Sequence, residues 1–170
     1  KVLVNGASGG VGTFAVQIAK ALGAEVTGVC STRNVELVRS LGADHVIDYT
    51  QQDFTRAGQR YDVVIDAVGN RSLRDVRRAL VPSGVHVLIG GPKDDPWLGP
   101  VLGFIKAPVV SRFTSQRVVV LLAQTNEADL LALNELVAAG KVTTVIDRSY
   151  PFAQVTEALG RSSSTDAATL

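Results

Sequence analysis

The chain has 170 residues, of which 46% are hydrophobic and 19% charged, and its formal net charge is +1. This composition is typical of a globular protein and excludes disorder of the whole chain. No block of like charge marks a nucleic-acid-binding arm, and Arg71, Arg74 and Arg78 recur at the spacing of a solvated helix face, so no nucleic-acid partner is expected.

The single cysteine, Cys30, excludes an internal disulfide and a zinc site made of cysteines. No apolar run reaches the roughly 18 residues of a membrane span, and no signal-peptide pattern is present. We therefore expect no membrane association and a reducing, cytoplasmic location. The sequence enters an apolar run directly after Lys1, without an initiator methionine, which predicts a piece of a longer protein.

The first half of the chain alternates strand-like runs with helical segments. A strand is predicted at residues 2–4, followed by a turn of small residues and a helix over 11–22 that ends before Gly23. Further strands are predicted at 25–30, 45–48 and 61–68, with a helix over about 31–41. Three consecutive aliphatic residues at 63–65 are typical of a strand covered on both faces.

The second half begins with a predicted helix over 72–80, a turn at 82–84 and a strand at 85–89. A connection rich in Gly and Pro follows, then a predicted strand at 109–115 and a helix at 127–139 with Asn126 as its N-cap. Residues 141–150 alternate like a half-buried strand, 152–159 predict a short helix, and 161–170 a flexible tail. Strands that alternate with helices predict right-handed crossovers, hence an α/β fold with a parallel sheet.

The small residues after the first strand carry the clearest functional signal. In the G-x-G-x-x-G pattern of dinucleotide-binding proteins, the three glycines allow a tight turn, close approach to a pyrophosphate and close helix packing. Strand, turn and helix in this order direct backbone N–H groups and the positive end of a helix dipole at one point. The turn predicts a dinucleotide site, with a purely structural glycine turn as the alternative. The residues are Ala7, Ser8, Gly9, Gly10, Val11 and Gly12.

Other nucleotide-binding families fit the sequence less well. The pattern G-x-x-x-x-G-K-[ST] is missing, which argues against a P-loop protein. None of the three tyrosines is followed by lysine four residues later, as a short-chain dehydrogenase would require. A methyltransferase with a similar glycine turn would need an acidic residue after the second strand, which is also missing.

The end of the second predicted strand bears on the choice of cofactor. A protein specific for NAD places Asp or Glu there, where the carboxylate binds the ribose 2′-OH. This sequence has Cys30-Ser31-Thr32-Arg33 instead. Hydroxyls and a guanidinium at the start of a helix suit a 2′-phosphate, so Ser31 and Arg33 predict NADPH rather than NADH. An ordinary N-cap at Ser31 and an exposed helix-start residue at Arg33 are the alternative interpretation.

Five segments in order resemble the medium-chain dehydrogenase/reductase superfamily, specifically its quinone oxidoreductase-like branch of NADPH enzymes. They are GASGGVG, VTGVCST, ELVRSLGADHVIDY, YDVVIDAVGN and GKVTTVIDRSYPFAQVTEAL. The resemblance implies a doubly wound Rossmann domain over residues 1–140, with helices on both faces of a six-stranded parallel sheet in the order 3-2-1-4-5-6. It also implies that residues 141–160 return to a catalytic domain mostly absent from this sequence, so the chain alone is expected to be inactive.

The resemblance extends the list of candidate residues. It places Tyr49 with Ser31 and Arg33 around the 2′-phosphate. It also implies cofactor contacts at the carboxyl ends of later strands, from Val68, Gly69, Asn70, Gly90, Gly91, Arg112 and Phe113. Because the branch needs no metal and neither histidine has a neighbouring ligand in the sequence, no metal site is predicted. A homodimer through an edge strand at 109–115 is implied as well.

The leading hypothesis is an NADPH-dependent oxidoreductase that transfers hydride to a small-molecule substrate, namely a quinone, enone or other activated carbonyl. The sequence identifies no catalytic acid or base. Two alternatives stay open. One is a non-catalytic nucleotide-binding adaptor or redox-sensing module. The other is a zinc-dependent alcohol dehydrogenase whose zinc ligands lie in the missing part.

Overall fold

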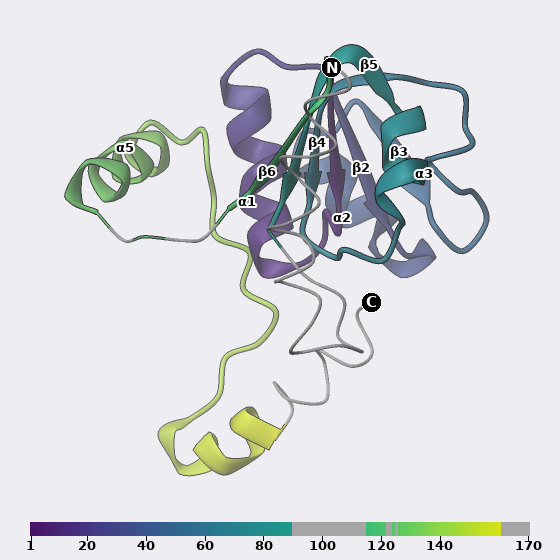
Figure 1. Ribbon diagram of the computed structural model, residues 1–170. Helices are drawn as coiled ribbons and strands as arrows, with labels where there is room; N and C mark the ends of the chain where they lie inside the picture. The colour runs from purple at the N-terminus through teal and green to yellow at the C-terminus, as the bar shows by residue number, and fades with distance from the viewer. Residues whose placement is uncertain (90–114, 122–123, 125, 161–170) are drawn as a thin grey trace.

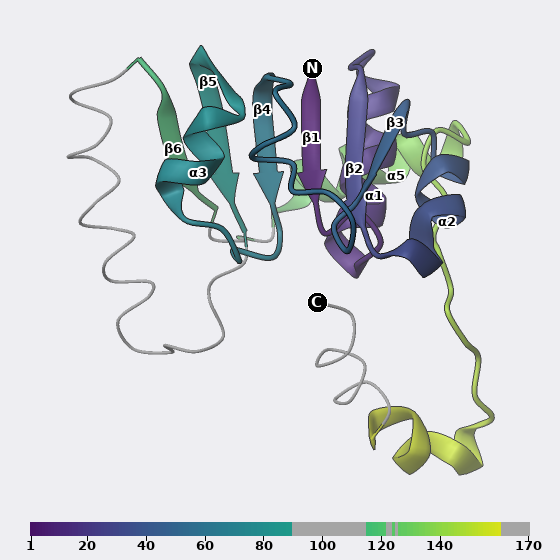
Figure 2. The ribbon, with the colours of Figure 1, turned by 90° about the vertical axis from the view of Figure 1, so that its right-hand side faces the viewer.

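The computed structural model describes residues 1–89, 115–121, 124 and 126–160. Six parallel strands form one sheet in the order β3-β2-β1-β4-β5-β6, with helices on both of its faces (Figures 1 and 2). The strands are β1 (Val2–Asn5), β2 (Val26–Cys30), β3 (His45–Asp48), β4 (Tyr61–Asp66), β5 (Leu80–Leu88) and β6 (Arg117–Val120). The helices are α1 (Gly10–Ala21), η1 (Thr32–Asn34), α2 (Val35–Ser40), α3 (Leu73–Arg78), α5 (Glu127–Ala138) and η2 (Phe152–Gln154).

Each face of the sheet has its own apolar core, because successive side chains of a strand point to opposite faces. Leu3 of β1 lies in the cluster that includes Val76 of α3, whereas its neighbour Val4 lies in the cluster that includes Val16 of α1 and Val38 of α2. All five of these residues are fully buried. The doubly wound α/β sandwich and its strand order are as predicted.

Most predicted elements agree with the structure to within two residues. The N-cap of α5 is confirmed, since the Asn126 side chain accepts a hydrogen bond of 2.9 Å from the Asp129 N–H. Gly23 follows α1 with φ +83° and Gly42 follows α2 with φ +97°, the left-handed backbone that ends helices at glycine. The predicted turn at 82–84 lies inside β5, where the pairing with β4 shifts register.

The structure differs from two strand predictions. The strand beside β5 is β6, at Arg117–Val120, whereas Ser115 at the end of the predicted range 109–115 lies in a bend and residues 109–114 lie outside the described residues. Three consecutive valines in β6 suit a parallel strand better than the mixed run before them. Residues 141–150 form no strand and are mostly exposed, because no neighbouring described strand pairs with them.

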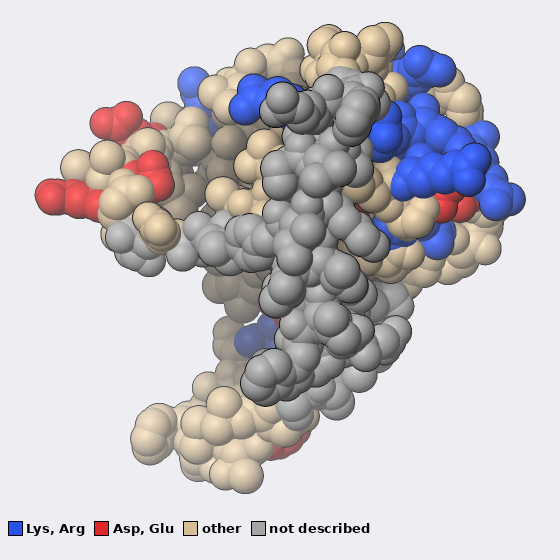
Figure 3. All heavy atoms as spheres, viewed as in Figure 1, with Lys and Arg blue, Asp and Glu red and all other residues tan. Residues whose placement is uncertain are grey.

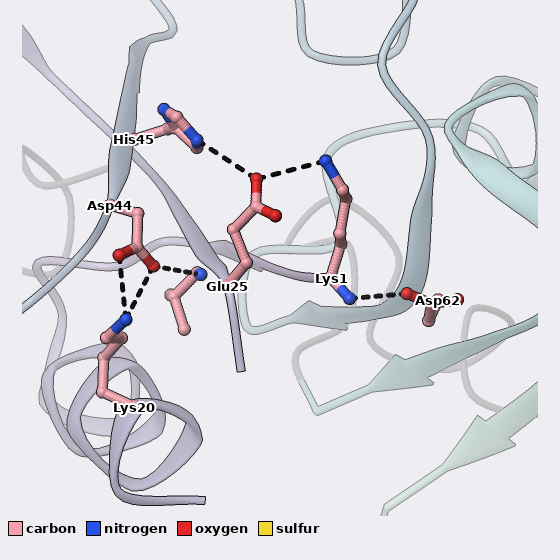
Figure 4. A network of polar contacts seen from close by, with 7 residues as sticks. Lys1, Lys20, Glu25, Asp44, His45 and Asp62 are labelled. Carbon is pink, nitrogen blue, oxygen red and sulfur yellow. Dashed lines mark hydrogen bonds and ion pairs between the residues drawn. The ribbon is translucent and has the colours of Figure 1, made fainter. Parts of the chain in front are cut away.

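Polar contacts at the amino ends of the strands join β1, β2, β3 and α1 (Figure 4). Glu25 lies between Lys1 and His45, with both nitrogens 3.2 Å from its Oε1. Asp44 accepts hydrogen bonds from Lys20 at 2.8 Å and from the Val26 N–H at 2.7 Å. The Lys20 hydrogen bond, together with that from the Val26 amide, lowers the pKa of Asp44. Charged side chains therefore connect the amino ends of β1, β2 and β3.

The segment after α5 is attached to the sheet domain through α1. The Gln17 side chain donates a hydrogen bond of 3.0 Å to the Thr143 carbonyl and accepts one of 2.8 Å from the Thr143 N–H. Val142 beside it is only 2% exposed. Beyond this point the chain runs away from the sheet to η2 (Figure 2), where Phe152 is 91% exposed. Residues 155–160 are helical, as predicted.

Candidate cofactor site

The candidate site lies at the carboxyl ends of β1 and β4, where the strand order reverses. The chain leaves β1 toward α1 on one face, and leaves β4 toward α3 on the other (Figure 1). In open α/β sheets such a reversal opens a crevice that binds ligands. Asn5 and Asp66 are paired neighbours at the last positions of the two strands, so they lie at the base of this crevice.

The glycine turn is compact because two of its glycines have no room for a side chain. A Cβ on Gly12 would lie 2.0 Å from the Gly6 carbonyl oxygen, so α1 packs directly on the end of β1. Gly6 has φ +86°, and a Cβ there would lie 2.7 Å from Val68 of the loop after β4. The turn between them thus brings the N-terminus of α1 to the crevice.

The N-terminus of α1 can receive an anion. Its N-cap is Gly9, which has no side chain to bind the first N–H groups, and α1 has no acidic residue in its first turn. The N–H groups of Gly10, Val11 and Gly12 have no partner inside the helix, since a helix leaves its first donors free. The helix dipole adds positive potential at the same point. Backbone donors without a competing carboxylate suit a pyrophosphate.

The end of β2 is connected to the glycine turn by a residue that the sequence did not single out. The Asn34 amide donates hydrogen bonds to the hydroxyls of Ser8, at 3.0 Å, and Ser31, at 3.2 Å. Asn34 thereby holds Ser8, a predicted pyrophosphate contact, beside Ser31, a predicted 2′-phosphate contact. Arg33, one residue before Asn34, is exposed on η1.

A carboxylate lies beside this group, although none follows β2 in the sequence. Asp48 at the end of β3 accepts hydrogen bonds from the Thr32 hydroxyl at 2.6 Å and from the Thr50 hydroxyl at 2.7 Å. The hydrogen bond from Thr32 is the largest influence, and together with those from Thr50 and Gln51 it lowers the pKa of Asp48. The ionised carboxylate is therefore occupied by neighbouring donors.

Asp66 is the most buried charged group of the crevice. It is 0% exposed, and its Oδ1 accepts hydrogen bonds from Asn5 Nδ2 at 2.9 Å and from the N–H groups of Val68, at 3.1 Å, and Gly69, at 2.8 Å. Its Oδ2 lies 3.3 Å from His86 Nε2. Burial raises the pKa of Asp66, but these hydrogen bonds outweigh burial and the net shift is downward.

The structure brings several predicted residues together around one narrow hollow at this edge. Its walls come from the ends of β1, β2, β3 and β4 and are formed by Asn5, Gly6, Ser8, Val29, Cys30, Tyr49, Val68 and Asn70. Burial is the main cause that raises the pKa of Cys30, to about 11, so its thiol stays neutral. Gly90, Gly91, Arg112 and Phe113 lie outside the described residues, so their predicted contacts stay predictions.

A second, open hollow lies between α3 and the start of β6, lined by Arg74, Arg77, Arg78, Pro82, Ser115 and Gln116. Figure 3 shows basic side chains gathered over α3. Arg78 pairs with Asp75 at 2.8 Å, and Arg77 donates to Gln116 at 2.9 Å. The pairing of Arg78 with Asp75 fits the solvated helix face expected from the sequence.

Within the described ranges, no three His, Cys, Asp or Glu side chains converge as ligands for a metal ion. None of the helices in the part of the chain that the structure describes combines the length and hydrophobicity needed to span a bilayer.

Comparison with known proteins assigns the chain to a family. A family profile described as zinc-binding dehydrogenase matches residues 41–168. A zinc-type alcohol dehydrogenase-like protein of Schizosaccharomyces pombe is 36% identical over 165 residues, which cover 95% of this chain and 48% of that protein. The chain thus spans about half the length of this relative.

Solved structures share the fold. The quinone oxidoreductase of Coxiella burnetii superposes with a TM-score of 0.77 at 29% identity, over 96% of this chain and 49% of that one. The Escherichia coli quinone oxidoreductase complexed with NADPH has a TM-score of 0.64 at 26% identity, over 85% and 47% of the two chains. This chain belongs to the zinc-binding dehydrogenase family of medium-chain dehydrogenases and reductases and forms its oxidoreductase cofactor-binding domain.

Proposed function

We propose that this domain binds NADPH and serves an oxidoreductase that transfers hydride to a quinone, enone or other activated carbonyl. The observation that carries the proposal is the Asn34 bridge, which holds Ser8 of the glycine turn beside Ser31 at the end of β2. A dinucleotide whose pyrophosphate meets the N-terminus of α1 extends its adenosine ribose toward the end of β2. Ser31 and Arg33 are then the residues that meet a 2′-phosphate.

The residues present fit such a cofactor. The glycine turn leaves room for a close phosphate approach, and the first N–H groups of α1 would bind the pyrophosphate. Tyr49, which is 36% exposed, and Val68 would line the two sides of the crevice. The bound dinucleotide supplies the hydride itself, so the domain's task is to hold it in place and exclude water. The quinone oxidoreductase neighbours support the class of substrate.

Direct binding measurements test the choice of cofactor. We expect NADPH to bind more tightly than NADH, and Arg33→Ala to weaken NADPH by about 1.5–3 kcal/mol while sparing NADH, the range for a hydrogen bond to a charged group. Arg39→Ala is the matched control, because Arg39 is also an exposed arginine but lies on α2, where it pairs with Glu36 at 2.6 Å. Equal affinity of the wild-type protein for both cofactors would contradict the proposal.

Asp48 offers a second test of the same site. Its carboxylate is bonded to Thr32, the residue between Ser31 and Arg33, and adds negative charge near the proposed 2′-phosphate. Asp48→Asn is therefore expected to raise the affinity for NADPH relative to NADH. A variant that shifts preference toward NADH instead would place the 2′-position elsewhere.

The arrangement of the whole protein is part of the proposal. We propose that residues 1–140 form the cofactor domain and that residues 141–160 lead into a catalytic part of a longer protein, which fits a chain that covers only 48% of its Schizosaccharomyces pombe relative. We also propose a homodimer through the sheet edge. The edge strand beside β5 is β6, so the proposed contact moves from the predicted range to Arg117–Val120. A monomer by light scattering would refute the dimer.

The non-catalytic adaptor predicts the same binding but no turnover. Assaying the full-length gene product with NADPH and a panel of small quinones and enones separates the two functions. Turnover supports the oxidoreductase, and tight NADPH binding with no turnover on any substrate supports the adaptor. No metal-binding role is assigned to the described residues.

A further inference from the structure

We infer that Asp66 is a positioning residue that fixes the width of the cofactor crevice and orients loop 67–70 toward the nicotinamide half of the dinucleotide. The inference rests on the proposed function and extends it to a group that does not itself face the cofactor, since Asp66 is 0% exposed. Neither the glycine motif nor the family resemblance singles out this residue.

Asp66 connects the two lips of the crevice. One lip is the glycine turn after β1 and the other is loop 67–70 after β4, and each strand ends on one of the bonded pair Asn5 and Asp66. Asn5 Nδ2 donates to Asp66 Oδ1 at 2.9 Å and to Asn70 Oδ1 at 3.3 Å. A single amide therefore holds the start of the glycine turn against both ends of the opposite loop.

The same carboxylate oxygen determines the path of the loop. Asp66 Oδ1 also accepts the N–H groups of Val68 and Gly69, so three donors converge on one atom. Gly69 has φ +69°, a left-handed backbone that this capped turn stabilises. These bonds place Val68 close to Gly6. A Cβ added to Gly6 would lie 2.7 Å from the Val68 side chain. Loss of the acceptor would release the loop and leave the part-buried N–H groups of Val68 and Gly69 without this partner.

The two carboxylate oxygens have separate tasks, which makes the inference testable. All bonds to the turn and loop use Oδ1, whereas Oδ2 lies 3.3 Å from His86 Nε2. Asp66→Asn retains an oxygen in the Oδ1 position. Its amide N–H can donate to His86 when the imidazole is in the tautomer whose Nε2 accepts a hydrogen bond. Asp66→Ala removes the oxygen. Asn should therefore preserve loop geometry and Ala should not, although both variants remove the charge.

The experiment compares NADPH with 2′,5′-ADP, which carries the 2′-phosphate but lacks the nicotinamide half. Dissociation constants are measured by calorimetry for wild type, Asp66→Ala, Asp66→Asn and Asn5→Ala. We expect Asp66→Ala to raise the dissociation constant of NADPH about tenfold, the size of effect that loss of one hydrogen bond to a charged group implies. The dissociation constant of 2′,5′-ADP should change less than about twofold. Asp66→Asn should keep NADPH affinity within about threefold of wild type. Asn5→Ala carries the test if Asp66→Ala does not fold, with the same selective loss of NADPH.

Asp44→Ala is the control, because Asp44 also accepts a backbone N–H, at 2.7 Å from Val26, but at the opposite end of the sheet. It should leave the ratio of the two affinities unchanged. Equal losses of both ligands in Asp66→Ala, or an Asp66→Asn variant as weak as Asp66→Ala, would overturn the inference. So would a wild-type protein that binds NADPH no more tightly than 2′,5′-ADP. A wild-type protein that binds neither ligand overturns the proposed function instead.

Discussion

Substituting Gly12 by alanine tests the close packing of α1 on the glycine turn. The new Cβ would lie 2.0 Å from the Gly6 carbonyl oxygen and 2.8 Å from the Ala7 Cα, whereas real Cβ atoms essentially never come within 3.0 Å of another heavy atom. Both obstructing groups are backbone, so no side chain can rotate away. The helix must therefore lift by about 1 Å, which loosens its contacts with the sheet throughout.

The expected cost lies at the upper end of the overpacking range, at about 3 kcal/mol. With a urea m-value of roughly 2 kcal/mol/M, the unfolding midpoint should fall by about 1.5 M. Gly10→Ala is the matched control, because a Cβ at Gly10 meets no atom within 4 Å and helix propensity favours alanine by up to about 1 kcal/mol. Equal midpoints for the two variants, measured by circular dichroism without ligand, would refute the packing argument.

Three further outcomes follow from buried groups. Cys30 should react with a thiol reagent at pH 8 at a negligible rate in the folded protein and rapidly in urea, because burial raises its pKa to about 11; fast labelling of the native state would contradict this. The pKa of Asp66 is lowered below 3.8, so its stabilising contribution is present above about pH 4 and disappears as the pH falls through the lowered value. The stability gap between wild type and Asp66→Asn in urea titrations should close on acidification, and a constant gap would exclude this linkage. Gln17→Ala should raise hydrogen exchange at the Thr143 amide without affecting β1, and unchanged exchange there would show that Gln17 does not hold the segment.

Local sequence patterns predicted most of the fold because its inner strands β1 and β2 are buried nearly throughout. Consecutive aliphatic residues also mark the centre of β4, at 63–65, and the glycines that end α1 and α2 mark the breaks between elements. The pattern misled at residues 141–150, where alternation suggested a half-buried strand. Alternation of apolar and polar residues indicates only that one face of the segment could be buried. The described residues provide no strand beside this segment.

The candidate site was predictable where it depends on backbone and not where it depends on long-range side-chain contacts. Ser8 and Ser31 could be named from the motif and the strand end. Asn34 connects them, but it lies 26 residues after Ser8 in the sequence, and no spacing rule indicates such a contact. Asp66 left a usable signal, since a carboxylate at the end of a buried parallel strand lies at the carboxyl end of the sheet. Its pairing with His86 required the register of β4 and β5.

Helix α1 has two attachments that lie on the same rigid element. Its first turn faces the crevice, and Gln17, near its middle, holds the backbone of Thr143 through two hydrogen bonds. An α-helix of 12 residues is about 18 Å long and moves as a rod. A displacement of the α1 N-terminus would therefore also displace Gln17 and, through its two hydrogen bonds, Thr143.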